Sequence, residues 1–335
     1  MARQRSQRVL GLLAGVAVVT LLCFLSLAIG TRTTSLSTVW QAVVSYDRGD
    51  TDQLVIRELR LPRTILGVLV GAALGLAGAV MQGVTRNPLA DPGILGVNAG
   101  AALFVVVAIS VFGLTSVTGY VWFAFGGAGI AAVVVYSIAS LGRDGATPVK
   151  LALAGAAVSA ALGAVTISFL LFDQAAFDQF RFWQVGALAG RDMAVAAQVA
   201  PFLIVGSLFA LTLGRVLNTL SLGEDTARGL GAHVGLSRAL AAVAVVLLCG
   251  GATAAAGPIG FLGLTIPHVA RMITGPDYRW ALPYSMVLAP VLLLSADIIG
   301  RVIARPGEVQ VGIVTAVIGA PVFIALVRRR KLAEL

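Results

Sequence analysis

Asp297 is the one carboxylate deep within an apolar stretch, and Arg301 follows it four residues later. A charged side chain at the centre of a bilayer costs roughly 2.5 to 3.5 kcal/mol on insertion scales, so this carboxylate must be paired, protonated or in contact with water. Residues four apart share one face of a helix, so Arg301 can reach Asp297. The spacing favours a structural ion pair. The alternative chemistry is a proton relay, for which the sequence offers no second intramembrane carboxylate.

Other patterns that carry chemistry are missing from the sequence. Neither Lys150 nor Lys331 follows the glycine of a phosphate-binding P-loop, so any ATP must be bound by another subunit. His233 and His268 are not at metal-ligand spacing, and no G-x-S-x-G nucleophile elbow occurs. The two cysteines lie in apolar stretches and offer no disulfide framework. The chain is therefore expected to be neither an enzyme nor a metal-binding protein.

The segment 31–63 concentrates charge of both signs. A docking surface for an acidic partner would explain its five arginines, whereas four carboxylates nearly neutralise the same segment, and charge alone leaves both interpretations open. The arginines are Arg32, Arg48, Arg57, Arg60 and Arg63, and the carboxylates are Asp47, Asp50, Asp52 and Glu58.

A second polar segment, at about 219–238, separates two apolar stretches. Within it, residues 222–231 have an acidic start, a short helical stretch and a glycine stop, which predicts a short helix lying along the membrane surface. Such a helix either links two membrane spans or fits into a cytoplasmic partner. Periodicity does not choose between these two roles.

The elements that must position these residues are membrane spans. Of the 335 residues 58% are hydrophobic and 12% charged, whereas soluble domains carry about 25% charged residues, which excludes an ordinary soluble enzyme. The apolar residues form blocks of roughly 20, the length that crosses a hydrocarbon core. Ten spans are predicted within one permease domain of residues 1–335, at about 9–30, 64–84, 94–114, 119–141, 151–172, 194–217, 238–257, 259–275, 281–304 and 310–327.

The charges at the chain ends predict the topology. An even number of spans places both termini on one side, and clusters of basic residues near both ends put that side in the cytoplasm by the positive-inside rule. The net charge of +9 is then a topology signal in the loops of a multi-pass membrane protein, and nucleic-acid binding is not expected. The first apolar block is too long for a signal peptide, so a retained first helix is expected.

Motifs occur in order along the chain. The first third contains Arg60-Leu61-Pro62-Arg63, Gly71-Ala72-Ala73-Leu74 and Arg86-Asn87-Pro88-Leu89-Ala90-Asp91-Pro92. The middle contains Leu153-Ala154-Gly155, Trp183-Gln184-Val185-Gly186 and the segment 222–231. The last third contains Gly257-Pro258-Ile259-Gly260-Phe261, Pro267-His268, Ala296-Asp297 and Gly319-Ala320-Pro321. In this order they resemble the FecCD family, the permease subunits of type II ABC importers for iron siderophores and cobalamin, along nearly the whole chain.

The resemblance implies an all-α permease of the type II importer fold in a bacterial cytoplasmic membrane. Two permease chains form a path at their interface, either as a heterodimer or as a homodimer. Two ATPase subunits bind ATP and Mg on the cytoplasmic face, and a substrate-binding protein docks outside. The permease itself is implied to hold no cofactor.

The resemblance also implies roles for particular residues. Arg60, Arg63 and Arg301 fall where family members place the external arginines that pair with acidic residues of the binding protein. The segment 222–231 matches the coupling helix that contacts the ATPase, with Leu222, Gly223, Glu224, Asp225, Ala227, Arg228, Leu230 and Gly231. The inner gate and the path are expected to involve Thr147, Pro148, Val149 and Ser159.

The residues of several motifs resemble those of ferric enterobactin permease subunits. The predicted function is therefore import of an intact ferric siderophore. The catecholate type is one candidate for that siderophore. A haem or cobalamin permease of the same fold is the first alternative. A proton-coupled secondary transporter, which would act alone, is the second, and a purely structural membrane protein is the third.

Overall fold

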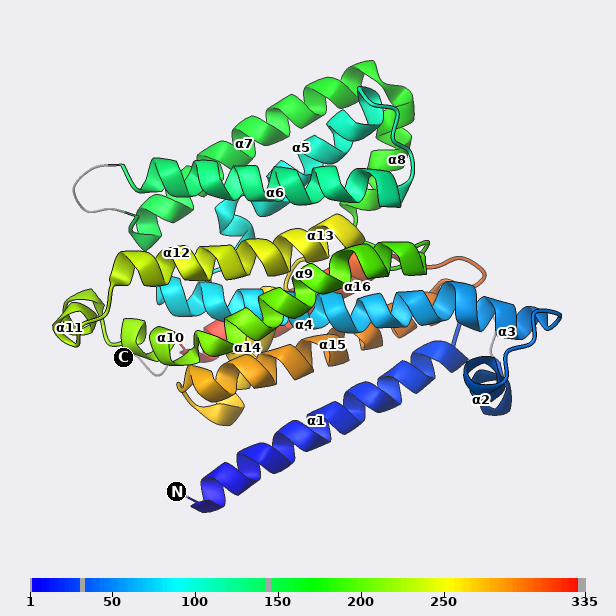
Figure 1. Cartoon of the computed structure of the whole chain (residues 1–335), viewed down its shortest axis with the longest axis horizontal. Helices are drawn as coiled ribbons and strands as arrows, with labels where there is room; N and C mark the ends of the chain where they lie inside the picture. The colour runs from blue at the N-terminus through cyan, green and yellow to red at the C-terminus, as the bar shows by residue number, and fades with distance from the viewer. Residues whose placement is uncertain (1, 31–33, 142–145, 331–335) are drawn as a thin grey trace.

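The computed structural model describes residues 2–30, 34–141 and 146–330, and every regular element in these ranges is helical. Figure 1 shows the long helices lying side by side along one direction. The start of α1 and the end of α16 lie at one end of this bundle together with α11, which we call the terminal end. The opposite end carries α2, α3 and α8, and we call it the distal end.

The long helices form the bundle and the short elements connect them. In chain order the longer helices are α1 (Ala2–Ala28), α4 (Leu61–Thr85), α5 (Val97–Ser110), α6 (Val117–Ala139), α7 (Pro148–Phe172), α9 (Met193–Thr212), α12 (Val234–Val245), α14 (Leu262–Thr274), α15 (Tyr278–Ile303) and α16 (Val311–Arg330). The shorter helices are α2 (Leu36–Val44), α3 (Thr51–Val55), α8 (Gln174–Gln184), α10 (Gly214–Ser221), α11 (Glu224–Gly229) and α13 (Gly251–Ala256). The remaining turns are the π-helical η1 (Ile56–Arg60) and η3 (Val246–Gly250) and the 3₁₀ turn η2 (Pro92–Leu95).

Each of the ten apolar ranges expected from the sequence contains a helix. Among the described residues, seven helices are long and apolar enough to cross a membrane. They are Arg5–Ala28, Thr51–Thr85, Val117–Ala139, Pro148–Phe172, Met193–Thr212, Val234–Ala256 and Tyr278–Ile303. The helices in the ranges 94–114 and 259–275, α5 and α14, have 14 and 13 residues, fewer than a full span needs.

The backbone explains why two of these ranges hold shorter helices than predicted. Gly96 and Gly113 have φ of +73° and +66°, so α5 is confined to 14 residues between them. Gly257 (φ +74°) and Phe261 (φ +65°) likewise delay α14 until Leu262. Left-handed residues cannot continue a right-handed helix, and apolar composition does not reveal them. Helices α5 and α14 are therefore shorter than the predicted spans 94–114 and 259–275.

Helix α4 lies at the centre of the bundle, and nearly all of its residues are buried. It packs closely on α15 because glycines face that helix: a Cβ at Gly71 would lie 2.8 Å from the Pro290 backbone nitrogen, and one at Gly75 would meet the Ser285 carbonyl. Small residues at such a ladder let two helix backbones approach. This close approach fixes the spacing of the side chains that α4 and α15 carry toward the distal end.

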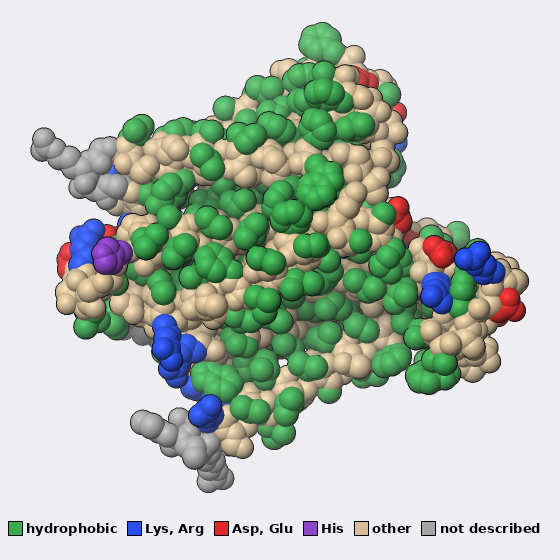
Figure 2. Space-filling model, viewed as in Figure 1, with side chains coloured by type: hydrophobic (Ala, Val, Ile, Leu, Met, Phe, Trp, Pro, Cys, Tyr) green, Lys and Arg blue, Asp and Glu red, His purple; other side chains and the backbone are tan. Residues whose placement is uncertain are grey.

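The remaining helices flank this central pair. Helix α1 packs along α15 at one edge, while α5, α6 and α7 form a group at the other edge. Figure 2 shows hydrophobic side chains over the middle of the visible face, with charged side chains gathered toward its two ends. This banding is the surface that a bilayer-spanning bundle presents to lipid.

Candidate functional site

The distal end holds a cluster of charged residues from three parts of the chain. Arg60 and Arg63 lie where η1 passes into α4, within the continuous helix Thr51–Thr85. Asp297 and Arg301 lie one turn apart near the end of α15, and Glu308 lies in the connection to α16. The Asp50 side chain caps the start of α3, from which the helix continues through η1 into α4.

Asp297 is held between two guanidinium groups. Arg63 donates to it from Nε at 3.0 Å and from Nη2 at 2.7 Å, and Arg301 donates from Nε at 3.0 Å and also from Nη2. The carboxylate is 1% exposed. Arg63 also donates from Nη1 to Glu308 at 2.6 Å, so it bridges a buried carboxylate and a more exposed one. Such charge-assisted forks fix orientation as well as adding attraction.

Arg60 and Arg301 also donate hydrogen bonds to carbonyl oxygens at the end of α1 and so cap that helix. Arg301 Nη1 donates to the carbonyl of Ser26 at 2.8 Å, and Arg60 Nη1 donates to those of Leu27 at 2.7 Å and Ala28 at 2.9 Å. The last carbonyls of a helix have no partner within the helix, and cations suit the negative end of its dipole. The cluster therefore fastens α1 to α4 and α15.

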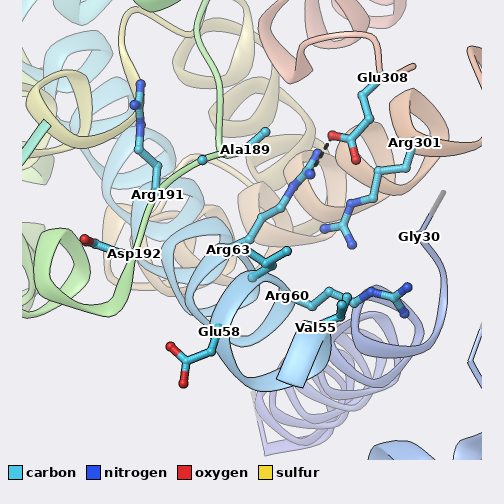
Figure 3. Close-up of a pocket in the computed structure, with 12 residues that line it drawn as sticks. Gly30, Val55, Glu58, Arg60, Arg63, Ala189, Arg191, Asp192, Arg301 and Glu308 are labelled. Atoms are coloured by element: carbon cyan, nitrogen blue, oxygen red, sulfur yellow. Dashed lines mark hydrogen bonds and ion pairs between the residues drawn. The ribbon is translucent and has the colours of Figure 1, made fainter. Parts of the chain in front are cut away.

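An open cavity of about 320 Å³ adjoins this cluster. Figure 3 shows Arg63, Arg301 and Glu308 pointing toward one another, while Arg60 extends toward Gly30, which follows α1. The charged residues that line the cavity are Glu58, Arg60, Arg63, Arg191, Asp192, Arg301 and Glu308. Four arginines and three carboxylates thus line the cavity, and a fourth carboxylate, that of Asp297, lies behind them.

The three arginines expected to dock the binding protein are therefore brought together at one site. All three are buried and each donates to acceptors of this same chain. The site can offer guanidinium groups to an incoming carboxylate at the cavity mouth. Glu308 is the acceptor that such a carboxylate could most easily replace. Its side chain is 29% exposed, against 1% for Asp297.

At the terminal end, residues 222–231 form a compact turn around α11. The Glu224 carboxylate is the anchor, because it pairs with Arg238, with Arg228 at 3.3 Å and with Arg86 at 3.8 Å. Ala227 is fully buried in a small apolar cluster with Leu220 and others. These contacts hold the turn against the neighbouring helices.

Two leucines of this turn point outward. Leu222 and Leu230 are 59% and 67% exposed, and they flank α11 on the chain. Gly223 (φ +103°) and Gly231 (φ +82°) adopt conformations that other residues rarely take, which sets the direction of the chain beside each leucine. The structure thus separates Gly223, Glu224, Ala227 and Gly231, which shape the turn, from exposed side chains that can contact a partner: Leu222, Asp225, Arg228 and Leu230.

The expected gate residues occupy the start of α7. The Thr147 hydroxyl accepts from the Lys150 backbone N–H at 3.3 Å as the helix cap, Pro148 begins the helix, and Val149 is 68% exposed. Ser159 lies twelve residues further, about 18 Å along the helix axis. It is half-buried beside Gly96, so the structure does not place it with the other three residues.

Several residues of the distal cluster were not expected from the sequence. Glu308, Arg191 and Asp192 line the cavity, and Ser26 accepts from Arg301 and shares a hydrogen bond of 2.8 Å with Thr64. Glu308 and Asp192 stand among few acidic residues in a chain with 15 Asp and Glu, and this scarcity was the signal that could have singled them out. Their partners, however, lie far away in the sequence.

Comparison with known proteins assigns this architecture to a family. A family model described as the FecCD transport family matches residues 18–329. The chain is 48% identical over 307 residues to the ferric enterobactin transport system permease protein FepD of Escherichia coli, covering 91% of each chain. It is 42% identical over 324 residues to the iron(3+)-hydroxamate import system permease protein FhuB of Bacillus subtilis, covering 96% of this chain and 84% of the relative.

A solved structure carries the same fold. It is described as an inward-facing conformation of a metal-chelate type ABC transporter. It matches this chain with a TM-score of 0.83 and 30% sequence identity, and the match covers 95% of this chain and 98% of the chain in that structure. The chain is thus an all-helical, multi-pass permease of the bacterial cytoplasmic membrane with the type II ABC importer fold. Such a subunit is not an enzyme, and it works with ATPase and binding-protein partners. The chain belongs to the FecCD transport family.

Proposed function

We propose that this permease carries an intact ferric siderophore, of the catecholate type, from a binding protein into the cytoplasm, driven by two separate ATPase subunits that bind ATP and Mg. The observation that carries the proposal is the 48% identity to a ferric enterobactin permease along 91% of both chains. The hydroxamate relative at 42% identity supports iron chelates as the cargo class. The permease itself supplies the path.

The proposed topology has ten spans and cytoplasmic termini in a single permease domain of residues 1–335. Helices α5 and α14 follow buried turns at Gly96 and Gly257, and irregular backbone at membrane depth is tolerated where it is buried in protein. The terminal end then faces the cytoplasm and the distal end faces outward. Basic residues near both chain ends support this orientation.

The proposed docking site is the distal cavity with Arg60, Arg63 and Arg301. A carboxylate of the binding protein would enter at the mouth and take the place of Glu308 on Arg63 Nη1. Asp297 would stay in place, because it is buried and bound by two guanidinium groups. The internal pairs thus hold the arginines in position for a partner while leaving one exchangeable contact.

The proposed coupling surface is the turn around α11. Leu222 and Leu230 would contact the ATPase, while Glu224 and Ala227 make the turn rigid enough to transmit its motion. Thr147, Pro148 and Val149 would form the inner gate at the same end, and Ser159 would line the path further along α7. The weakly buried face of α7 is where a second permease chain, different or identical, would pack.

The contacts of Asp297 support an importer over a proton carrier. This carboxylate binds two arginines of its own chain, so a proton relay would first have to break both pairs. Haem and cobalamin remain the alternative cargoes of the same fold.

Uptake measurements test the proposal. In cells that lack this chain, uptake of radiolabelled ferric catecholate siderophore is expected to fall, and a plasmid copy should restore it. Labelled ferric hydroxamate, haem and cobalamin are measured in parallel under iron limitation. Loss of haem or cobalamin uptake alone would replace the cargo, and unchanged uptake of all four would contradict the proposed function.

A further inference from the structure

A basic hollow lies at the terminal end, outside the sites described above. It is open, has a volume of about 750 Å³ and is formed by three helices, α1, α10 and α15. Figure 2 shows Lys and Arg side chains in this region of the molecule, near the start of α1. Its lining residues are Arg5, Arg8, Arg215, Asp277, Arg279, Trp280 and Pro283.

The hollow carries an excess of positive charge. Its one carboxylate, Asp277, accepts from Asn218 Nδ2 at 2.7 Å and from the backbone N–H of Arg279 at 3.0 Å. Partial burial acts to raise the pKa of Asp277, but these hydrogen bonds and the Arg279 guanidinium outweigh it and hold the pKa below its usual value. Asp277 is therefore ionised and offsets a single arginine, the neighbouring Arg279 at 3.3 Å.

The other three arginines have no such partner. In the part of the chain that the structure describes, Arg5, Arg8 and Arg215 form no ion pair with a carboxylate. Arg8 lies against the Trp280 ring, with its Cζ 5.9 Å from the ring centroid. Three guanidinium groups from two helices thus converge on one open space, which favours a ligand with a phosphate group.

The surroundings of the hollow indicate a lipid. Helix α1 is apolar, yet only 6% of its most apolar window is buried within this chain, so the surface that does not pack on α15 is open to the hydrocarbon of a bilayer. Arg5 and Arg8 lie where this helix leaves that layer. Trp280 and Pro283 add an apolar rim, and tryptophan is typical of the headgroup level. Basic pockets between spanning helices at this level are suited to anionic headgroups.

We propose that this hollow binds the phosphate of an anionic phospholipid headgroup in the leaflet at the terminal end. Arg5 and Arg8 of α1 and Arg215 of α10 donate to the phosphate, and the acyl chains lie along α1 beside Trp280. The lipid then fastens α1 to α10, two helices that no ion pair among the described residues connects. The lipid binds whether or not a siderophore is the cargo.

Lipid binding to the purified, full-length permease in complex with its ATPase tests this site. Native mass spectrometry in a neutral detergent gives the affinities for dioctanoyl phosphatidylglycerol and dioctanoyl phosphatidylcholine. Each arginine removed is expected to weaken phosphatidylglycerol binding about fivefold, and the variant Arg5→Gln/Arg8→Gln/Arg215→Gln by roughly a hundredfold. Phosphatidylcholine has the same phosphate but no net charge, so it should bind the wild type more weakly and lose less affinity in these variants.

Two further variants keep the test decisive. Arg48→Gln/Arg57→Gln/Arg181→Gln removes the same charge from exposed positions at the distal end and should bind phosphatidylglycerol like the wild type. The single change Arg215→Gln, at an exposed position, should still show the fivefold effect if the triple variant does not fold.

Three results would overturn the proposal. One is equal phosphatidylglycerol affinity in the wild type and in Arg215→Gln. Another is inorganic phosphate binding as tightly as the lipid, which would make the ligand a soluble anion. The third is loss of the ATPase from the triple variant with lipid binding unchanged, which would make the hollow an ATPase contact.

Discussion

The arginines at the two ends of the molecule have opposite environments. At the distal end Arg63 and Arg301 are buried and donate to Asp297, Glu308 and helix carbonyls. At the terminal end Arg5 and Arg215 are exposed, and among the described residues they have no carboxylate partner. A charge taken out of water must be matched inside the protein, whereas an exposed charge is satisfied by solvent or by a ligand. Residue type alone therefore does not reveal whether an arginine stabilises the fold or binds a partner.

The largest expected effect comes from removing the buried carboxylate that pairs with Arg63 and Arg301. Asp297→Ala leaves two buried guanidinium groups without their shared carboxylate, so the free energy of unfolding should fall by about 3 to 5 kcal/mol. Thermal unfolding in detergent measures the change. Asp225→Ala, which removes a fully exposed carboxylate, is the control and should unfold like the wild type. Equal stability of Asp297→Ala and the wild type would show that the distal pairs do not hold the fold.

A second change targets the terminal end without touching its folded core. Leu222→Glu/Leu230→Glu places charges on two exposed side chains that we assign to the ATPase contact. In proteoliposomes with the complete importer, uptake should stop while ATP hydrolysis continues. Leu222→Met/Leu230→Met keeps the surface apolar and should transport normally. Normal uptake by the Glu variant would remove these leucines from the coupling surface.

A third change sharpens the idea of an exchangeable contact at the distal end. Glu308→Gln frees Arg63 Nη1 for a carboxylate of the binding protein, so the Kd for docking should tighten by about fivefold, which corresponds to roughly 1 kcal/mol for a partly exposed pair. Titration of the labelled binding protein measures it. Glu58→Gln removes the same charge from the same cavity but does not release Arg63. If both variants tighten docking equally, general electrostatics explains the effect and no exchange at Arg63 is needed.

The smallest effect is expected where a charge pair is exposed. Arg181 and Asp178 lie 3.3 Å apart on α8, and both side chains are about half exposed. Arg181→Gln should change the unfolding free energy by about 0.5 kcal/mol or less. Comparing its thermal unfolding with that of Asp297→Ala measures the contrast between exposed and buried pairs directly, and a loss near that of Asp297→Ala would contradict the burial argument.

The sequence predicted what depends on local spacing. Asp297 and Arg301 are four residues apart, so one helix turn brings them into contact, and the structure shows this ion pair. The sequence also placed a helix in each apolar range, because a bilayer requires long apolar helices. It missed the turns at Gly96 and Phe261, since a left-handed residue leaves no trace in apolar composition.

Tertiary structure decided what depends on residues far apart. Arg63 meets Asp297 across 234 positions because glycines on α4 let that helix approach α15. The same packing buried the three arginines expected to face a partner, and two of them, Arg60 and Arg301, also cap α1. By itself the sequence determined the membrane class, the helices and the family motifs, because hydropathy and local spacing encode them. Which charges are matched inside the protein and which stay open to a ligand was decided only by packing, because burial sets the cost of an unpaired charge.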